Sequence, residues 1–224
     1  MFRQRLRLWF RVVGDLRFLS HHDTMRLWER ALRRAGLPLR MSEGFNPRPR
    51  MSLPEPRSVG VASDAEILEF ELADWVSPDA ILAGLGRQVP EGIRITSLDL
   101  VRPTDKARPE AVVYVADPPS PPADLADRIA RLLAADRLPI VRHRPTGDKP
   151  LDARLFIESV EMDGPFGEAQ DRPFGDAQDR PRVRMVLRTG PKGTVRPDEV
   201  LRLLGFDAEA IARADIRRSE IRLG

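Results

Sequence analysis

The sequence predicts an α+β protein made of two ferredoxin-like units in tandem, each with an antiparallel sheet. The order β-α-β-β-α-β can be read twice along the 224 residues. An apolar fraction of 42% is ordinary for globular domains, so each unit can bury a core. We expect the first unit at residues 1–103 and the second at 110–224, joined by a polar stretch.

The first predicted strand alternates in character up to Val12. Its apolar positions include Leu6, Leu8 and Phe10, which share one face. The opposite face, which the helices of a ferredoxin-like unit leave open, carries Arg3, Arg5, Arg7, Trp9 and Arg11. On RNA-recognition sheets such side chains stack bases and contact phosphates. The alternative is that Glu69 and Glu71 on a neighbouring strand neutralise these arginines as cross-strand ion pairs.

A helix is predicted from about Ser20 to Ala35. Ser20 is a suitable N-cap, Asp23 favours the first turn, and Gly36 ends the helix. The apolar stripe includes Trp28 and Leu32. The exposed side is basic and carries Arg26, Arg30, Arg33 and Arg34.

The first unit continues with short extended pieces near 51–53 and 58–62 and a strand at 65–72. A helix is predicted to start at Ser77-Pro78, because proline is favoured at the first helical position, and a strand follows at 93–101. The acids along the strand region are predicted to form a solvated face: Asp64, Glu66, Glu69 and Glu71.

The second unit repeats this order. Its predicted elements are strands at 111–116, 138–144, 151–162, 183–189 and 216–223, helices at 120–135 and 197–204, and a short turn at 208–213. PFGEAQDR at 165–172 is followed by PFGDAQDR at 173–180, a tandem duplication with one acidic exchange. We interpret the insertion at about 164–181 as a polar hairpin extension.

The net charge of +3 conceals a strong asymmetry. Residues 1–57 contain 13 arginines and 5 acids, whereas residues 58–100 contain 2 arginines and 8 acids. Concentration of cations in the first quarter of the chain indicates an anionic partner, and RNA is the partner we expect.

The loop 42–50, SEGFNPRPR, is the strongest binding candidate. Its prolines stiffen the backbone, which lowers the entropy lost on binding. We expect its polar and aromatic side chains to contact RNA or another substrate, together with cations and a histidine from the preceding helix start. The predicted set is Arg17, His21, Arg26, Glu43, Phe45, Asn46, Arg48 and Arg50. The helix start and the loop are expected to converge on one concave basic surface.

Several chemistries are excluded or unsupported. The chain has no cysteine, so it can hold neither a disulfide nor a cysteine-bound iron–sulfur cluster. Three histidines without metal-ligand spacing give no metal site, and no phosphate-binding P-loop is present. No apolar stretch approaches the roughly 18 residues of a membrane span, and the N-terminus lacks the apolar core of a signal peptide. We therefore expect a cytoplasmic protein with no cofactor of its own and no membrane partner.

A long string in the first unit resembles a known family. GDLRFLSHHDTMR, followed by RALRRAGLPLRMSEGFNPRPRMSLPEPRSVGV, is similar to the opening of the radical-SAM-linked protein family. That family is a domain of unknown function fused to, or encoded beside, cobalamin-binding radical SAM proteins. In its pattern His21 and Asp23 recur, whereas the position of His22 is usually apolar. The resemblance implies a radical SAM protein as partner.

The sequence leaves three functions open. The first is an accessory protein without catalytic activity that binds RNA or presents a substrate to a radical SAM partner. The second is a metal-independent endoribonuclease, which would resemble the CRISPR repeat-processing nucleases and use His21 as acid or base, although their glycine-rich loop near the C-terminus is missing. The third is a subunit that binds only protein.

Overall fold

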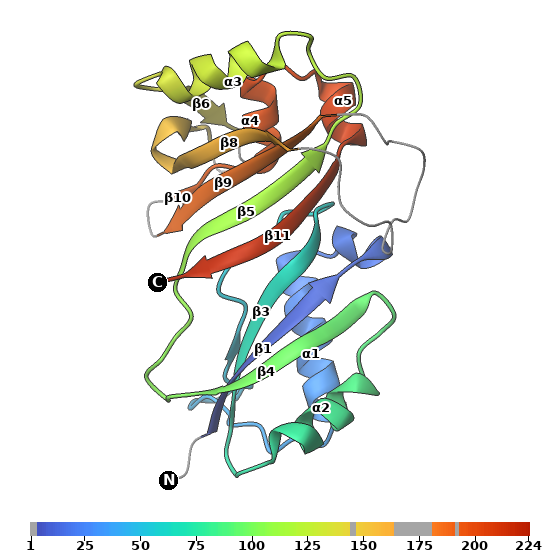
Figure 1. Cartoon of the computed structure of the whole chain (residues 1–224). Helices are drawn as coiled ribbons and strands as arrows, with labels where there is room; N and C mark the ends of the chain where they lie inside the picture. The colour runs from blue at the N-terminus through green and yellow to red at the C-terminus, as the bar shows by residue number, and fades with distance from the viewer. Residues whose placement is uncertain (1–3, 144–146, 164–180, 191–192) are drawn as a thin grey trace. The chain divides into compact units, whose positions relative to one another are not determined.

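The chain has a mixed α+β architecture with mostly antiparallel sheet. The computed structural model describes residues 4–143, 147–163, 181–190 and 193–224. It divides into two compact units, Met1–Pro109 with Leu223–Gly224, and Glu110–Arg222. Five α-helices occur in the described residues (Figure 1).

The sheet of the first unit is antiparallel. Its strands are β1 (Gln4–Val12), β2 (Met51–Ser52), β3 (Ala62–Leu72) and β4 (Ile93–Val101). β1 lies between β3 and β4, and β2 pairs with the outer side of β3, so the order is β4-β1-β3-β2. Alternation in β1 is confirmed, because Leu6, Leu8 and Phe10 are fully buried.

Two helices complete the first unit. The structure confirms α1 (His21–Arg34) and its cap, since the Ser20 hydroxyl accepts a hydrogen bond from the Asp23 N–H at 3.2 Å. In α2 (Pro78–Gly86) the Ser77 hydroxyl plays the same part. Both helices pack with β1 and β3 into one core, where the Trp28 ring meets Phe10 edge-on at 4.7 Å between centroids.

The second unit contains four main strands. They are β5 (Pro109–Asp117), β8 (Ile157–Asp163), β9 (Arg182–Gly190) and β11 (Asp215–Leu223), in the order β11-β5-β9-β8. A two-residue strand, β10 (Gly193–Thr194), also pairs with β9.

The helices and the additional hairpin of the second unit are short. The helices are α3 (Leu125–Ala134), α4 (Pro197–Leu203) and α5 (Ala208–Arg213). β6 (Pro139–Arg142) and β7 (Lys149–Asp152) form a separate two-stranded sheet. A 3-10 turn, η2 (Ala153–Phe156), leads into β8.

Several element predictions need correction. The helix expected from residue 120 begins only at Leu125, because Ser120 adopts a left-handed φ of 55° and two prolines follow it. The strand expected at 151–162 is broken by η2. The strand expected at 58–62 is instead a turn in which Gly60 has φ 88°. A 3-10 turn that was not expected, η1 (Gly14–Phe18), precedes α1.

Other expectations fall outside what the structure describes. The duplicated octapeptide at 165–180 lies outside the described residues, as does Arg3. In the described part of the chain, no helix is both long enough and apolar enough to cross a membrane.

Candidate functional site

The predicted site residues lie beside two different parts of β3, its middle and its C-terminal end. His21, at the start of α1, lines a hollow together with Glu66. The loop is instead joined to Glu71, which accepts a main-chain hydrogen bond from Arg40 and donates one to Arg50. A strand rises about 3.3 Å per residue, so Glu66 and Glu71 are about 16 Å apart. The structure therefore does not bring the helix start and the loop together on one surface, because β3 runs between them.

The hollow at the helix start is small. Besides His21 and Glu66 it is lined by Thr24, Glu55 and Arg57, and its free volume of about 10 Å³ has room for about one water molecule. Partial burial lowers the pKa of His21, and the nearby His22 lowers it further, while Glu66 acts in the opposite direction. His21 is therefore predominantly neutral at pH 7.

Arg57 bonds to several residues around this hollow. Its guanidinium donates to the carbonyl oxygens of Arg17 at 2.8 Å, Leu16 at 3.3 Å, and Val61. Its Nε lies 3.7 Å from Oε1 of Glu66. This arginine thus ties the turn before α1 to Val61 and to Glu66. The Leu16 and Arg17 carbonyls also accept main-chain hydrogen bonds, from Leu19 and Gly60.

Neither Arg57 nor Glu66 was predicted as a site residue. Glu66 shares the buried face of β3 with Leu68 and Phe70, which is visible from the alternation of the strand. A buried acid on an apolar face requires a cation or hydrogen-bond donor as partner. The position of Glu66 on the apolar face of β3 was therefore the sequence signal for the Arg57–Glu66 pair. The expectation of a solvated acidic face is wrong for Glu66, Glu69 and Glu71, which are all buried.

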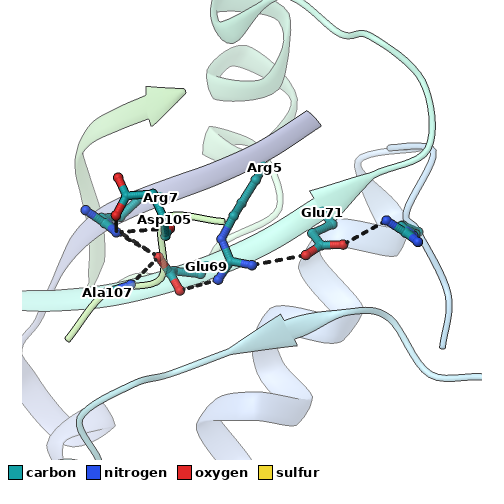
Figure 2. A network of polar contacts seen from close by, with 7 residues as sticks. Arg5, Arg7, Glu69, Glu71, Asp105 and Ala107 are labelled. Atoms are coloured by element: carbon teal, nitrogen blue, oxygen red, sulfur yellow. Dashed lines mark hydrogen bonds and ion pairs between the residues drawn. The ribbon is translucent and has the colours of Figure 1, made fainter. Parts of the chain in front are cut away.

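On the other face of β1 the arginines form ion pairs. Figure 2 shows Arg5 between Glu69 and Glu71, with Nη2 at 2.6 Å from Glu69 Oε2 and Nη1 at 3.0 Å from Glu71 Oε1. Arg7 donates twice to Glu69 Oε1, at 3.1 and 3.0 Å. Arg40 approaches Glu71 Oε2 at 3.4 Å. These buried carboxylates therefore join β1, β3 and the base of the loop.

The rest of this face is also paired. The Trp9 indole N–H donates to Asp99 at 3.1 Å, and Arg11 lies 3.5 Å from Asp64. Cross-strand pairing, which was one of the two expectations for this stripe, is thus what the described residues show. Arg5 in particular cannot meet a phosphate without first losing two carboxylate partners.

The loop 42–50 is a small closed hairpin. The Ser42 N–H donates to the Arg48 carbonyl at 2.7 Å, and the Arg48 N–H donates to the Ser42 hydroxyl at 3.0 Å. An isolated bridge pairs Met41 with Pro49. These bonds close the base of the loop.

The tip of the loop carries an aromatic ring and cations. Phe45 is 106% exposed, so none of its ring is buried against the protein. Arg48 is exposed and forms no ion pair with any residue that the structure describes. Arg50 is half-buried, and its Nη2 lies 4.0 Å from Oε1 of the exposed Glu43. The loop thus presents an aromatic face beside positive charge.

The exposed side of α1 adds further positive charge. Arg26, Arg30, Arg33 and Arg34 are all exposed, as predicted. Arg26 pairs with Asp23 at 3.6 Å and Arg33 with Glu29 at 3.0 Å. Arg33 and Arg34 lie in the last turn of α1, only a few residues before Leu39 bridges to Leu72. They therefore belong to the same end of the first unit as the loop.

No group of three or more His, Asp or Glu side chains in the described ranges is arranged to hold a metal ion. Among the described residues, Glu69 and Glu71 are engaged with arginines instead.

Comparisons with known proteins give one family match. Over the full chain, an unknown protein from Galdieria sulphuraria is 15% identical with 99% of its own chain covered, but its TM-score is only 0.28. A candidate transcriptional repressor of the glycine cleavage system is 11% identical, with both chains fully covered and a TM-score of 0.25. Neither likeness is close enough to carry an argument. No curated protein matches the sequence. Residues 5–197 match the family described as uncharacterized protein conserved in bacteria, DUF2344, and the chain belongs to this family.

Proposed function

We propose that this protein is a noncatalytic accessory protein that binds RNA through loop 42–50 and presents it to a radical SAM enzyme. The observation that carries the proposal is the wholly exposed Phe45, held in a hydrogen-bonded loop beside the exposed Arg48. Aromatic stacking with neighbouring cations is a common way for proteins to bind RNA. A ring that contributes nothing to the core is free to contact a ligand.

The architecture we propose for this role is a tandem of ferredoxin-like units. The sheet orders β4-β1-β3-β2 and β11-β5-β9-β8 each place the first strand of the unit beside its last and third strands. That is the order expected for the β-α-β-β-α-β motif. The hairpin of β6 and β7 is then an insertion in the second unit.

The sheet face that carries Arg5 and Arg7 is not our preferred RNA surface. Its arginines Arg5 and Arg7 already neutralise Glu69 and Glu71, so little net positive charge remains there. The loop end of the first unit differs, because Arg34, Arg48 and Arg50 meet only one nearby acid that the structure describes, Glu43. The loop end is thus where a phosphate backbone meets the strongest electrostatic attraction.

The radical SAM partner follows from the sequence resemblance alone. A cysteine-bound iron–sulfur cluster has to lie on the partner, because this chain has no cysteine. We infer that the two proteins act together in the cytoplasm, where the accessory chain supplies affinity for the RNA and the partner supplies the chemistry.

The endoribonuclease alternative receives less support. A neutral His21 is suited to act as a base, but the hollow beside it holds about one water molecule. A phosphodiester does not fit there without opening the Arg57–Glu66 pair. Incubation of labelled RNA with the protein and EDTA tests this directly, and cleavage that is lost in His21→Ala would favour the nuclease.

The proposal is tested by the double substitution Arg48→Ala, Arg50→Ala. Binding of a labelled oligoribonucleotide, followed by fluorescence anisotropy at several salt concentrations, should weaken. The salt slope should flatten by about 1.4 if each arginine contacts one phosphate of a single strand. Removing Arg202 and Arg213, exposed cations of α4 and α5, is the matched control for loss of charge.

Two results would contradict the proposal. One is RNA binding by the double variant that equals the wild type at every salt concentration. The other is loss of folding in that variant, seen by circular dichroism, because both side chains would then be structural. A partner test completes the experiment: the radical SAM protein should copurify with the wild type whether or not RNA is digested.

A further inference from the structure

We infer that loop 42–50 stacks an unpaired nucleobase on Phe45, so that its ligand is single-stranded RNA and not a duplex. This inference rests on the proposed function and specifies its substrate. It starts from the exposure of the ring, which at 106% leaves both aromatic faces open. Inside a duplex the faces of each base are covered by the neighbouring pairs, so only an unpaired or splayed-out base can stack on this ring.

The space beside the ring supports the same conclusion. Gly44, immediately before Phe45, has φ 119°, and a side chain built there would meet no atom within 4 Å. The backbone immediately before the ring is therefore open where that side chain would stand. The hydrogen bonds between Ser42 and Arg48 close the loop that carries the ring.

The loop carries two cations. They are Arg48 and Arg50, and the Glu43 carboxylate lies 4.0 Å from Arg50. Arg34 at the end of α1 adds charge at the same end of the unit, so the preference for an unpaired strand rests on the ring of Phe45 and not on the charge. One stacked base with one or two phosphate contacts is the pattern of single-strand binding sites.

A consequence for specificity follows. Every base has an aromatic face, so stacking on Phe45 tolerates different sequences. The neighbouring Asn46 is exposed, and its amide offers both a donor and an acceptor to the edge of the stacked base. We therefore expect modest base preference together with strong preference for unpaired RNA.

The test compares two probes on the full-length protein. The first is an oligoadenylate that carries 2-aminopurine, whose fluorescence is quenched when the base stacks. The second is the same strand annealed to oligouridylate. The wild type should bind and quench the single strand and bind the duplex much more weakly. Phe45→Leu should raise the dissociation constant for the single strand roughly 5- to 150-fold, the range for loss of one base–aromatic stack.

Two further variants show whether the effect depends on the aromatic ring of Phe45. Phe45→Trp should retain the quenching, because it keeps an aromatic face. Phe18→Leu removes another exposed phenylalanine of the same unit and should leave binding unchanged. Equal affinity for duplex and single strand, or normal binding by Phe45→Leu, would overturn the inference while RNA binding itself stood. No binding of either probe by the wild type would instead overturn the proposed function.

Discussion

Arg5 and Glu69 form a buried ion pair, with Nη2 of Arg5 2.6 Å from Oε2 of Glu69 and both side chains more than nine-tenths buried. The Glu69 carboxylate has other partners besides Arg5. Its other oxygen accepts from Arg7 and from the Ala107 N–H at 2.9 Å, so Glu69 also holds the chain that follows β4. A carboxylate with this many donors satisfies its hydrogen bonding without water.

The first prediction concerns this pair. Glu69→Gln keeps the shape of the side chain but leaves Arg5 and Arg7 without their shared negative charge. We expect the free energy of unfolding to fall by about 3–5 kcal/mol, as for other buried pairs that lose one partner. Urea unfolding followed by circular dichroism measures this change.

A matched control is available on α1. Glu29→Gln breaks the exposed pair with Arg33 and should change stability by no more than about 0.5 kcal/mol. If the two substitutions destabilise equally, the buried network does not hold the sheet together.

The second prediction concerns Gly92. A Cβ at this position would lie 2.8 Å from the carbonyl oxygen of Val13, and φ is 91°. Gly14 also has a left-handed φ, of 62°, but a Cβ there meets nothing within 4 Å. Gly14→Ala should therefore cost about 1–2 kcal/mol of stability for the backbone alone.

Gly92→Ala should cost more than Gly14→Ala by a further 1–3 kcal/mol or so, since the backbone near Val13 has to shift. Denaturant unfolding of the two variants under the same conditions separates the cost of the contact with the Val13 oxygen from the cost of the left-handed backbone. Equal losses would mean that Val13 moves away freely and that the contact is not tight.

The third prediction concerns pH. Burial and the nearby His22 lower the pKa of His21 in the folded protein. Below the ordinary pKa of about 6.5 the unfolded chain then binds more protons at this residue than the folded chain does. The contribution of His21 to the free energy of unfolding is therefore complete above about pH 6.5 and is lost as the pH falls.

An NMR titration should place the midpoint of His21 below 6.5 or so, the ordinary value. His21→Gln should reduce the fall in stability between neutral and mildly acidic pH, measured by urea unfolding at each pH. An unchanged pH dependence in His21→Gln would contradict the prediction.

The fourth prediction concerns the duplicated octapeptide. β8 and β9 pair up to Asp163 and Arg182, so the inserted sequence joins two strands that are already in register. Deleting residues 165–172 shortens this connection, and halving a loop changes its closure free energy by only about 0.6 kcal/mol. The melting temperature should therefore stay nearly unchanged in a thermal scan. A large fall would show that the repeat contributes to the fold.

Local sequence determined the helices and most of the strands of the first unit. Ser20 and Gly36 bound α1, because a hydroxyl cap and a left-handed glycine act within one turn of the chain. β4 spans the predicted residues 93–101 for a similar reason, as a turn at Gly92 precedes it.

Only the tertiary structure decided the environment of the charges and the place of the loop. Alternation assigns Glu66 and Glu69 to opposite faces of β3 but does not reveal that both faces are buried. The partners that make this burial tolerable, such as Arg5, come from more than sixty residues away. His21 lines the hollow beside Glu66, whereas the loop is bonded to Glu71, five residues further along β3. Pairing and desolvation depend on segments distant in sequence, so they are settled only when the sheet is assembled.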